Sequence, residues 1–411
     1  MKRKRLNFGV IYYVATFLLL LILFFTNDFN ATDVQKSAIV IAVGVDGTSE
    51  EFSVTAQISL PNKEEQGGTQ TSLITGKGST VAEAFRDVNA KTGWYPKLVF
   101  CKLIVLGESA CKENAFTALD YFLRDEYFPD GCLIAACKGE ASKLLSTQTP
   151  VDKISALAAQ KVLSRHAERV GAVAPMTLRE FAEQFYSRGK SGVLPVLSTA
   201  PPSQSSEKSG SQQSGQNSEK QEGGQGEKQS SAQSGKTSKE SEQQVFQAKT
   251  SALFLDGKAV GKLTDEETFA FCLVRNKLRL ADYGIEFENV DYTLNFRYTR
   301  PSLKLKIDEN GVPRLDISVK ITAGLKDVNA ALGVSETDGP ANIPDGLFER
   351  AQTKLEEEIA KTFETCRAAK CDALELFGEL ERKNADYLPV FREDLLERVI
   401  VTVRVKLDSV R

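Results

Sequence analysis

Histidine is almost absent from this sequence: His166 is the single histidine among 411 residues. Zinc and other transition-metal sites commonly draw several ligands from histidine, so a multi-histidine metal site is excluded. A Ser–His–Asp or Cys–His arrangement has one candidate base. That candidate lies in Ser164-Arg-His-Ala-Glu-Arg169, on the surface of an expected helix, and no nucleophile is indicated for it. We therefore interpret His166 as a solvated helix residue.

The sequence also lacks the short motifs that mark common catalytic sites. It contains no G-x-x-x-x-G-K-[ST], no G-x-G-x-x-G after a strand, no H-E-x-x-H and no G-x-S-x-G. The acidic triplet Glu356-Glu357-Glu358 falls inside an expected long helix and is most simply a solvated face. We therefore predict no catalytic, cofactor-binding or metal-ligating residues, no cofactor and no enzymatic activity. An extracytoplasmic enzyme, such as a wall hydrolase, is the least favoured function.

Neither sign of charge is in excess. The chain has 52 lysines and arginines against 55 aspartates and glutamates, for a formal net charge of −3. This balance gives no electrostatic argument for nucleic-acid binding. Hydrophobic residues make up 41% and charged residues 26%, which is typical of a globular protein. At about 150 residues per domain, the length predicts two or three domains.

A long apolar run lies at the N-terminus, from Leu6 to Phe25, directly after Lys2-Arg3-Lys4-Arg5. About 20 apolar residues suffice for a helix to cross the hydrocarbon core, and preceding cations keep their end cytoplasmic. We therefore expect residues 1–30 to be a single-pass membrane anchor, with the rest of the chain extracytoplasmic. A cleaved signal peptide is the alternative, because it too combines a charged start with an apolar core.

Seven cysteines would suggest disulfides in an exported protein. Cys132 and Cys137 lie five apart in a strand-like run, so their side chains point to opposite faces. Cys366 and Cys371 lie five apart in an expected helix, about 140° apart around its axis. We interpret the cysteines as buried thiols that act as small apolar groups. Disulfide bridges between cysteines that are distant in the sequence are the alternative. The full set is Cys101, Cys111, Cys132, Cys137, Cys272, Cys366 and Cys371.

Apolar residues almost vanish after Pro201-Pro202, where serine, glutamine, glycine, glutamate and lysine dominate. Such a segment cannot bury enough surface to offset the entropy of ordering. We therefore predict a disordered linker at 201–245. It separates a mixed α/β region at 31–200 from a C-terminal α+β domain at 246–411.

In region 31–200, strands and helices intermix. Ala38–Val45 is a continuous apolar run, typical of a buried strand. Phe52–Leu60 alternates apolar and polar residues, typical of a half-buried strand. A helix is expected after Ser79 or Thr80, either of which can cap it. Further expected elements are a strand at Val99–Leu106, a helix around Glu113–Leu123, a strand at Cys132–Cys137, and helices at Asp152–His166 and Thr177–Tyr186.

Strict alternation dominates region 246–411. It predicts strands at Val290–Tyr298, Leu303–Ile307, Leu315–Ile321 and Val399–Leu407, each with one wet face. A helix from about Phe348 to Leu380 repeats apolar residues near helical spacing and is expected to cover the other face. The predicted fold is α+β or mixed α/β: several mixed domains with antiparallel-rich sheets covered by helices, plus one N-terminal transmembrane helix.

The order of several short landmarks resembles the Ger(x)C family of spore germination proteins. The opening landmarks are Ala38-Ile-Val-Ile-Ala-Val-Gly-Val-Asp46 and Val54-Thr-Ala-Gln-Ile58, with Pro61 close behind. The others are Gly78-Ser-Thr-Val-Ala-Glu-Ala84, Val105-Leu-Gly-Glu108, Leu119-Asp-Tyr-Phe-Leu-Arg-Asp125, Ala252-Leu-Phe254, Gly257-Lys-Ala-Val-Gly-Lys-Leu263 and Glu267-Thr268. The long helix and the terminal Val399–Val405 strand match the family's ending. The resemblance spans about 38–200 and 246–408.

The resemblance implies a non-catalytic, extracytoplasmic C subunit of a germinant receptor, tethered to the spore inner membrane. It implies two membrane-embedded partner subunits, one permease-like, and a role in nutrient-triggered germination through protein–protein contacts. No family-wide catalytic or ligand residue carries over. The alternative function is a membrane-tethered envelope scaffold or assembly protein of the same fold, without receptor partners.

The sequence departs from the family pattern at the lipoprotein cysteine. Family members usually carry a cysteine that receives a lipid anchor, whereas here the corresponding stretch is Asn27-Asp-Phe-Asn-Ala-Thr-Asp33 and the first cysteine is Cys101. The expected N-terminal helix would replace the lipid. The Ser/Gln-rich linker and the glycine-free end Leu407-Asp-Ser-Val-Arg411 are further departures, and they leave a divergent paralogue as an open possibility.

Overall fold

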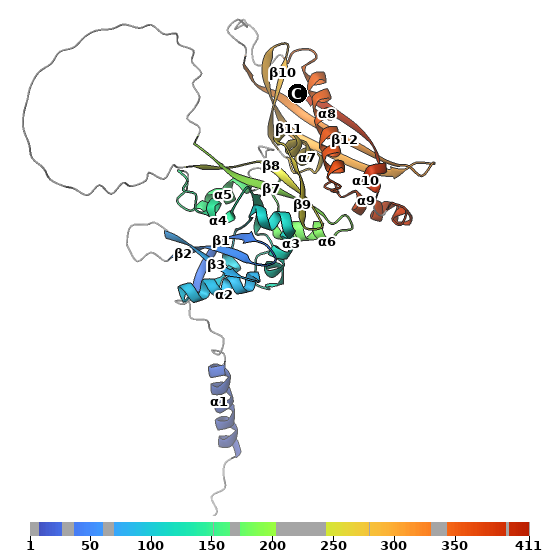
Figure 1. Ribbon diagram of the computed structural model, residues 1–411. Coiled ribbons are helices and arrows are strands. Elements are labelled where there is room, and N and C mark those ends of the chain that lie inside the picture. The colour runs from blue at the N-terminus through green and yellow to red at the C-terminus, as the bar shows by residue number, and fades with distance from the viewer. Residues whose placement is uncertain are drawn as a thin grey trace, which may run out of the picture.

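The computed structural model describes residues 8–26, 37–60, 70–150, 152–164, 173–202, 244–278, 280–329, 343–391 and 394–410. His166, the basic stretch Lys2–Arg5 and residues 203–243 of the predicted linker lie outside these described residues. The described chain contains a helix near its N-terminus and two sheets, named here sheet A and sheet B, with helices packed on them (Figure 1).

Sheet A has nine strands in the order β3-β2-β1-β5-β6-β7-β8-β9, with β4 paired to β1. The central strands β1, β5, β6 and β7 are parallel, and antiparallel strands flank them on both sides. The bounds are β1 Ser37–Gly47, β2 Phe52–Leu60, β3 Gln70–Gly78, β4 Tyr95–Lys97, β5 Leu103–Leu106, β6 Leu133–Cys137, β7 Ser191–Ala200, β8 Val245–Leu255 and β9 Lys258–Leu263.

Helices cover both faces of sheet A. One face packs against α2 (Val81–Thr92), α3 (Glu108–Arg124) and α6 (Leu178–Tyr186), and the other against α4 (Ala141–Leu145) and α5 (Ser155–Leu163). Strand β5 is apolar throughout because alternate side chains enter the two layers: Ile104 and Leu106 face α3, whereas Leu103 and Val105 face α4 and α5. Continuous apolar strands are expected where both faces of a sheet are buried.

Strands from both sides of residues 203–243 pair with each other. β7 and β8 run antiparallel, from Ser191 opposite Leu255 to Ala200 opposite Val245. β8 and β9 therefore complete sheet A, although they belong to the region predicted at 246–411. The first sheet extends past the predicted linker and ends at Leu263.

Sheet B has four strands in the order β10-β11-β12-β13. The first three are antiparallel, and β13 runs parallel to β12. Odd-numbered residues of β12 from Leu315 to Ala323 are buried in one core with α7 and α8, while the even-numbered residues face away from it. The bounds are β10 Ala281–Phe287, β11 Val290–Ile307, β12 Pro313–Asn329 and β13 Ile400–Ser409.

The helices of this part lie on one face of sheet B (Figure 1). They are α7 Asp265–Val274, α8 Leu347–Ala368, α9 Leu376–Lys383 and α10 Leu395–Arg398. The single helix predicted from Phe348 to Leu380 is therefore wrong. Lys370 and Glu375 have positive φ angles of 53° and 60°, which end α8 and start α9. Asp372 accepts hydrogen bonds from the first two backbone N–H groups of α9, at 2.7 and 2.9 Å.

The apolar N-terminal segment forms helix α1 (Phe8–Thr26). Within the described residues, no helix combines the length and hydropathy needed to cross a membrane. The predicted transmembrane helix is therefore not supported, whereas the predicted mixed α+β architecture is confirmed.

All seven cysteines are buried thiols outside any disulfide. Cys101 and Cys132 come closest, with 4.0 Å between their Sγ atoms. They precede the adjacent parallel strands β5 and β6, which explains why residues 31 apart in sequence meet. The interpretation of the cysteines as buried thiols is confirmed.

Candidate functional site

A cleft lies beside the α2–β4–α3 part of sheet A. Thr80 caps the start of α2 by accepting a hydrogen bond from Glu83, so of the two cap candidates Thr80 is used. Gly93, with φ of 69°, ends the helix and turns the chain into β4. There Tyr95 pairs with the start of β1. Asp125 follows the last residue of α3.

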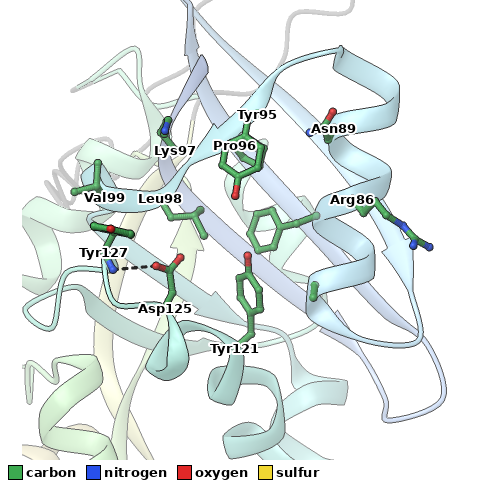
Figure 2. A pocket seen from close by; sticks show the side chains of 12 residues that line it. Arg86, Asn89, Tyr95, Pro96, Lys97, Leu98, Val99, Tyr121, Asp125 and Tyr127 are labelled. Carbon is green, nitrogen blue, oxygen red and sulfur yellow. Dashed lines mark hydrogen bonds between the residues drawn. The ribbon is translucent and has the colours of Figure 1, made fainter. Parts of the chain in front are cut away.

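These three elements enclose a cleft of about 620 Å³. Figure 2 shows Tyr95, Leu98, Tyr121, Asp125 and Tyr127 around it. The cleft therefore combines an aromatic wall with a single carboxylate.

The aromatic wall is anchored in the core below it. Phe85 is buried and stacks on Tyr121, with ring centroids 5.3 Å apart and planes at 26°. Phe122 packs edge-on against both rings. Tyr95 and Tyr127 are exposed at the rim. Burial, and then the Asp125 charge, raise the pKa of Tyr121, so this phenol stays protonated at neutral pH.

The charged side chains that line the cleft point in different directions (Figure 2). The backbone N–H of Tyr127 donates to Oδ1 of Asp125 at 2.9 Å, which turns the carboxylate toward the cleft (Figure 2). Arg86 points away from the cleft and lies 3.7 Å from Glu83. Lys97 has its Nζ 5.5 Å from the centre of the Tyr95 ring. Asp125 has no ion-pair partner in the described part of the chain.

Neither the composition nor the motifs pointed to this cleft. Its residues come from α2, β4 and α3, and their spacing in sequence matches no recognised pattern. The prediction of no catalytic, cofactor or metal residues stays a prediction. Over the described ranges, no three histidine, cysteine, aspartate or glutamate side chains form a group that could hold a metal ion.

The two most deeply buried aspartates have structural roles. Asp46, at the end of β1, accepts hydrogen bonds from the backbone N–H groups of Ala141 and Ser142 at 2.7 and 3.0 Å. A Cβ at Gly107 would overlap Oδ1 of Asp46, so glycine is required there. Burial raises the pKa of Asp46. Two of the sequence landmarks, around Asp46 and Gly107, thus meet at one buried carboxylate.

Asp372 links the two sheets. Its backbone N–H donates to Oγ of Ser191, the first residue of β7, at 2.8 Å, while its carboxylate holds α9 beside sheet B. Burial raises its pKa to about 6. Nearby, Arg188 pairs with Glu381 across the same junction at 3.0 Å.

The face of sheet B opposite the helices is basic around the β11–β12 hairpin and β13. Arg314 pairs with Asp308, Arg404 with Asp316 and Lys406 with Asp408, at 2.9, 3.7 and 3.2 Å. The remaining four cations have no ion-pair partner among the described residues. We call this set the basic face: Arg300, Lys304, Lys306, Arg314, Lys320, Arg404 and Lys406.

The chain matches two protein-family models. The model for the spore germination protein N-terminal domain covers residues 30–199, and the model described as spore germination B3/GerAC like, C-terminal, covers residues 249–410. Together they cover nearly all of both sheets. Both models describe spore germination proteins.

One curated relative and one solved structure agree with the family models. Spore germination protein KC of Bacillus subtilis (strain 168) is 22% identical over 387 residues, which is 90% of this chain and 87% of the relative. The crystal structure of the GerBC protein has the same fold, with a TM-score of 0.51 at 17% identity; the match covers 90% of this chain and 97% of that one. The chain therefore belongs to the Ger(x)C family of spore germination proteins.

Proposed function

We propose that this chain is a non-catalytic, membrane-associated extracytoplasmic subunit of a spore germinant receptor, and that it acts in nutrient-triggered germination through protein–protein contacts. The observation that carries the proposal is the match of both parts of the chain to germination-family models. Its partners are the membrane-embedded receptor subunits, including a permease-like one. Its place is the spore inner membrane.

Helix α1 is the segment we propose for membrane attachment. Every large apolar side chain described in it is exposed, from Leu21 at 41% to Tyr13 at 76%. An apolar surface of this extent calls for a nonaqueous neighbour. Cys101, the first cysteine in this sequence, is buried next to β5 and presents no exposed thiol.

The basic face supplies a second contact with the membrane surface. It extends over three adjacent strands, and it is strongly cationic in a chain whose net charge is −3. Tyr298, at 70% exposure, lies at its edge, opposite Thr322 of β12. Anionic lipid headgroups attract each nearby lysine or arginine with about 1 kcal/mol. Tyrosine is typical of the interfacial zone, where one end of the side chain is apolar and the other wet.

Deletion of the gene tests the receptor function directly. Spores of the deletion strain should form in normal numbers but lose germination in response to the nutrient that this receptor recognises, and the full-length gene should restore it. Spores that germinate normally with every nutrient tried would contradict the proposal.

A scaffold or assembly protein of the same fold is the second candidate. It is favoured if the chain is made during vegetative growth and its deletion changes envelope assembly while germination is unaffected. Membrane fractionation tests the membrane attachment that both candidate functions require. We expect the chain in the membrane fraction, and its release on removal of residues 1–30 together with reversal of the basic face.

A further inference from the structure

We propose that the cleft between α2, β4 and α3 binds a small organic ammonium ion that carries an apolar group. The proposal does not depend on the receptor function. It rests on the shape of the cleft, its aromatic walls and the direction of its charges.

The size of the cleft suits a small molecule. Its volume of about 620 Å³ falls within the range of about 300–1,000 Å³ typical of ligand sites. A second cleft of similar size lies between α8 and β13, but polar and charged side chains line most of it and no aromatic ring does. The aromatic cleft is therefore the better match to an apolar group.

The walls of the cleft suit a cation. The ring of Tyr121, supported by Phe85, forms one wall, and Tyr95 and Tyr127 stand at the rim (Figure 2). The faces of aromatic rings carry partial negative charge and attract ammonium groups, as in the aromatic cages that bind quaternary ammonium ligands. The phenol hydroxyls of Tyr95 and Tyr121 point toward the middle of the cleft (Figure 2) and can accept hydrogen bonds from an N–H group.

Arg86 and Lys97 also line the cleft, but Arg86 points away from it and Lys97 lies over the Tyr95 ring, so Asp125 is the charge that faces its middle (Figure 2). Asp125 places a carboxylate in the cleft, with one oxygen held by the Tyr127 N–H group and the other left to accept from a ligand. It stands at the C-terminal end of α3, where the helix dipole adds negative potential. Arg124, in the last turn, is occupied by Asp120 at 2.7 Å. A bound ammonium group would thus supply the missing counter-charge of Asp125.

The test uses the full chain in detergent and three probes of nearly equal shape: 2-phenylethylammonium, the neutral 2-phenylethanol and the anionic 3-phenylpropionate. Binding is followed by calorimetry and by the fluorescence of Trp94, which is the single tryptophan of the chain and precedes Tyr95. We expect saturable binding of the ammonium probe, at least about tenfold tighter than that of either other probe.

Two variants separate charge from shape. Asp125→Asn keeps the acceptor for the Tyr127 N–H group and should weaken the ammonium probe about tenfold while leaving the neutral probe unchanged. Asp291→Asn is the matched control, because it removes an exposed carboxylate of β11 that does not line the cleft, and it should leave binding unchanged. Absence of saturable binding by the ammonium probe, equal binding of the three probes, or equal effects of the two variants would overturn the proposal.

Discussion

The two sheets of this protein are buried in different ways. Sheet A has helices on both faces, and its central strands β5 and β6 are apolar at every position. Sheet B has helices on one face, and its other face carries lysines and arginines. The difference follows from the number of helical layers: sheet A buries side chains on both faces, whereas sheet B buries one face and leaves its cations on the other exposed to solvent.

The largest expected effect is on stability and follows from this difference. In β5, Ile104→Ala and Leu103→Ala should each lower the free energy of unfolding by about 2–5 kcal/mol, because neighbouring residues enter different cores. In β12, Ile317→Ala should cost about as much, whereas Ser318→Ala should change the stability by less than about 0.5 kcal/mol. Chemical denaturation measures all four. A large effect of Ser318→Ala would mean that the outer face of sheet B is covered.

The next effect concerns the basic face. Reversal of three unpaired cations, Lys304→Glu, Lys306→Glu and Lys320→Glu, should weaken binding to anionic phosphatidylglycerol vesicles by about a hundredfold or more, from about 1 kcal/mol for each cation removed. The assay is vesicle sedimentation with the chain from residue 31 onward. Its matched control reverses three exposed lysines on strands of sheet A: Lys249→Glu, Lys258→Glu and Lys262→Glu. Equal losses in the two triple variants would point to net charge alone and remove the distinction between the sheets. Loss of receptor-subunit binding with intact vesicle binding would assign the face to a protein partner.

Asp372, which joins the two sheets, should make stability depend on pH. Its pKa in the folded protein is about 6, above the usual value of 3.8, so the folded state holds the proton more tightly than the unfolded state. Stability contributed by this group is therefore greatest below about pH 4 and falls as the pH rises through 6. The fall should amount to at most about 3 kcal/mol. The fall should be absent from the pH profile of Asp372→Asn, which keeps one of the two acceptor oxygens for α9. An identical pH profile in wild type and variant would exclude Asp372 as the cause.

The smallest effect on stability is expected from cutting the chain between β7 and β8, the two strands of sheet A that flank residues 203–243. A protease site placed within residues 203–243 should yield two fragments that still elute together, because β7 and β8 pair along ten residues of sheet A. The melting temperature should change by only a few degrees. Fragments that separate without denaturant would instead support the division into independent domains at 31–200 and 246–411. We retain that division as a proposal about sequence organisation.

Local patterns predicted much of the fold. The alternation in Leu315–Ile321 correctly identified a strand with one solvent-exposed face, since burial on one side leaves a period of two. In Val290–Tyr298 the alternation holds as far as Phe296; Tyr298, expected on the buried face, lies beyond a register shift and is exposed. The prediction of one helix from Phe348 to Leu380 was wrong, because the chain forms two helices, α8 and α9, with a break between them. The break depends on Asp372, whose partners are set by tertiary contacts that periodicity does not record.

The cleft could not be predicted from the sequence either, because it too depends on tertiary contacts. Phe85, Tyr95 and Tyr121 each look like ordinary core or surface aromatics in sequence, and Asp125 is one of 55 acidic residues. They become a site because α2, β4 and α3 bring them to one cleft. The basic face, in contrast, was present in the alternation pattern. Its cations occupy the even-numbered positions of β11, β12 and β13, and could have been recognised by reading charge along each predicted wet face.

The antiparallel pairing of β7 with β8 also bears on how this chain can evolve and be labelled. Ala200 and Val245 are partners in the ladder, so the chain leaves and re-enters the sheet at the same point. The entropy of closing a loop between two such fixed ends grows only slowly, by about 0.6 kcal/mol for each doubling of its length. Insertions and deletions between these strands are therefore nearly neutral for folding. The same property makes this position suitable for a fluorescent domain or an epitope that would report the location of the protein without disturbing either sheet.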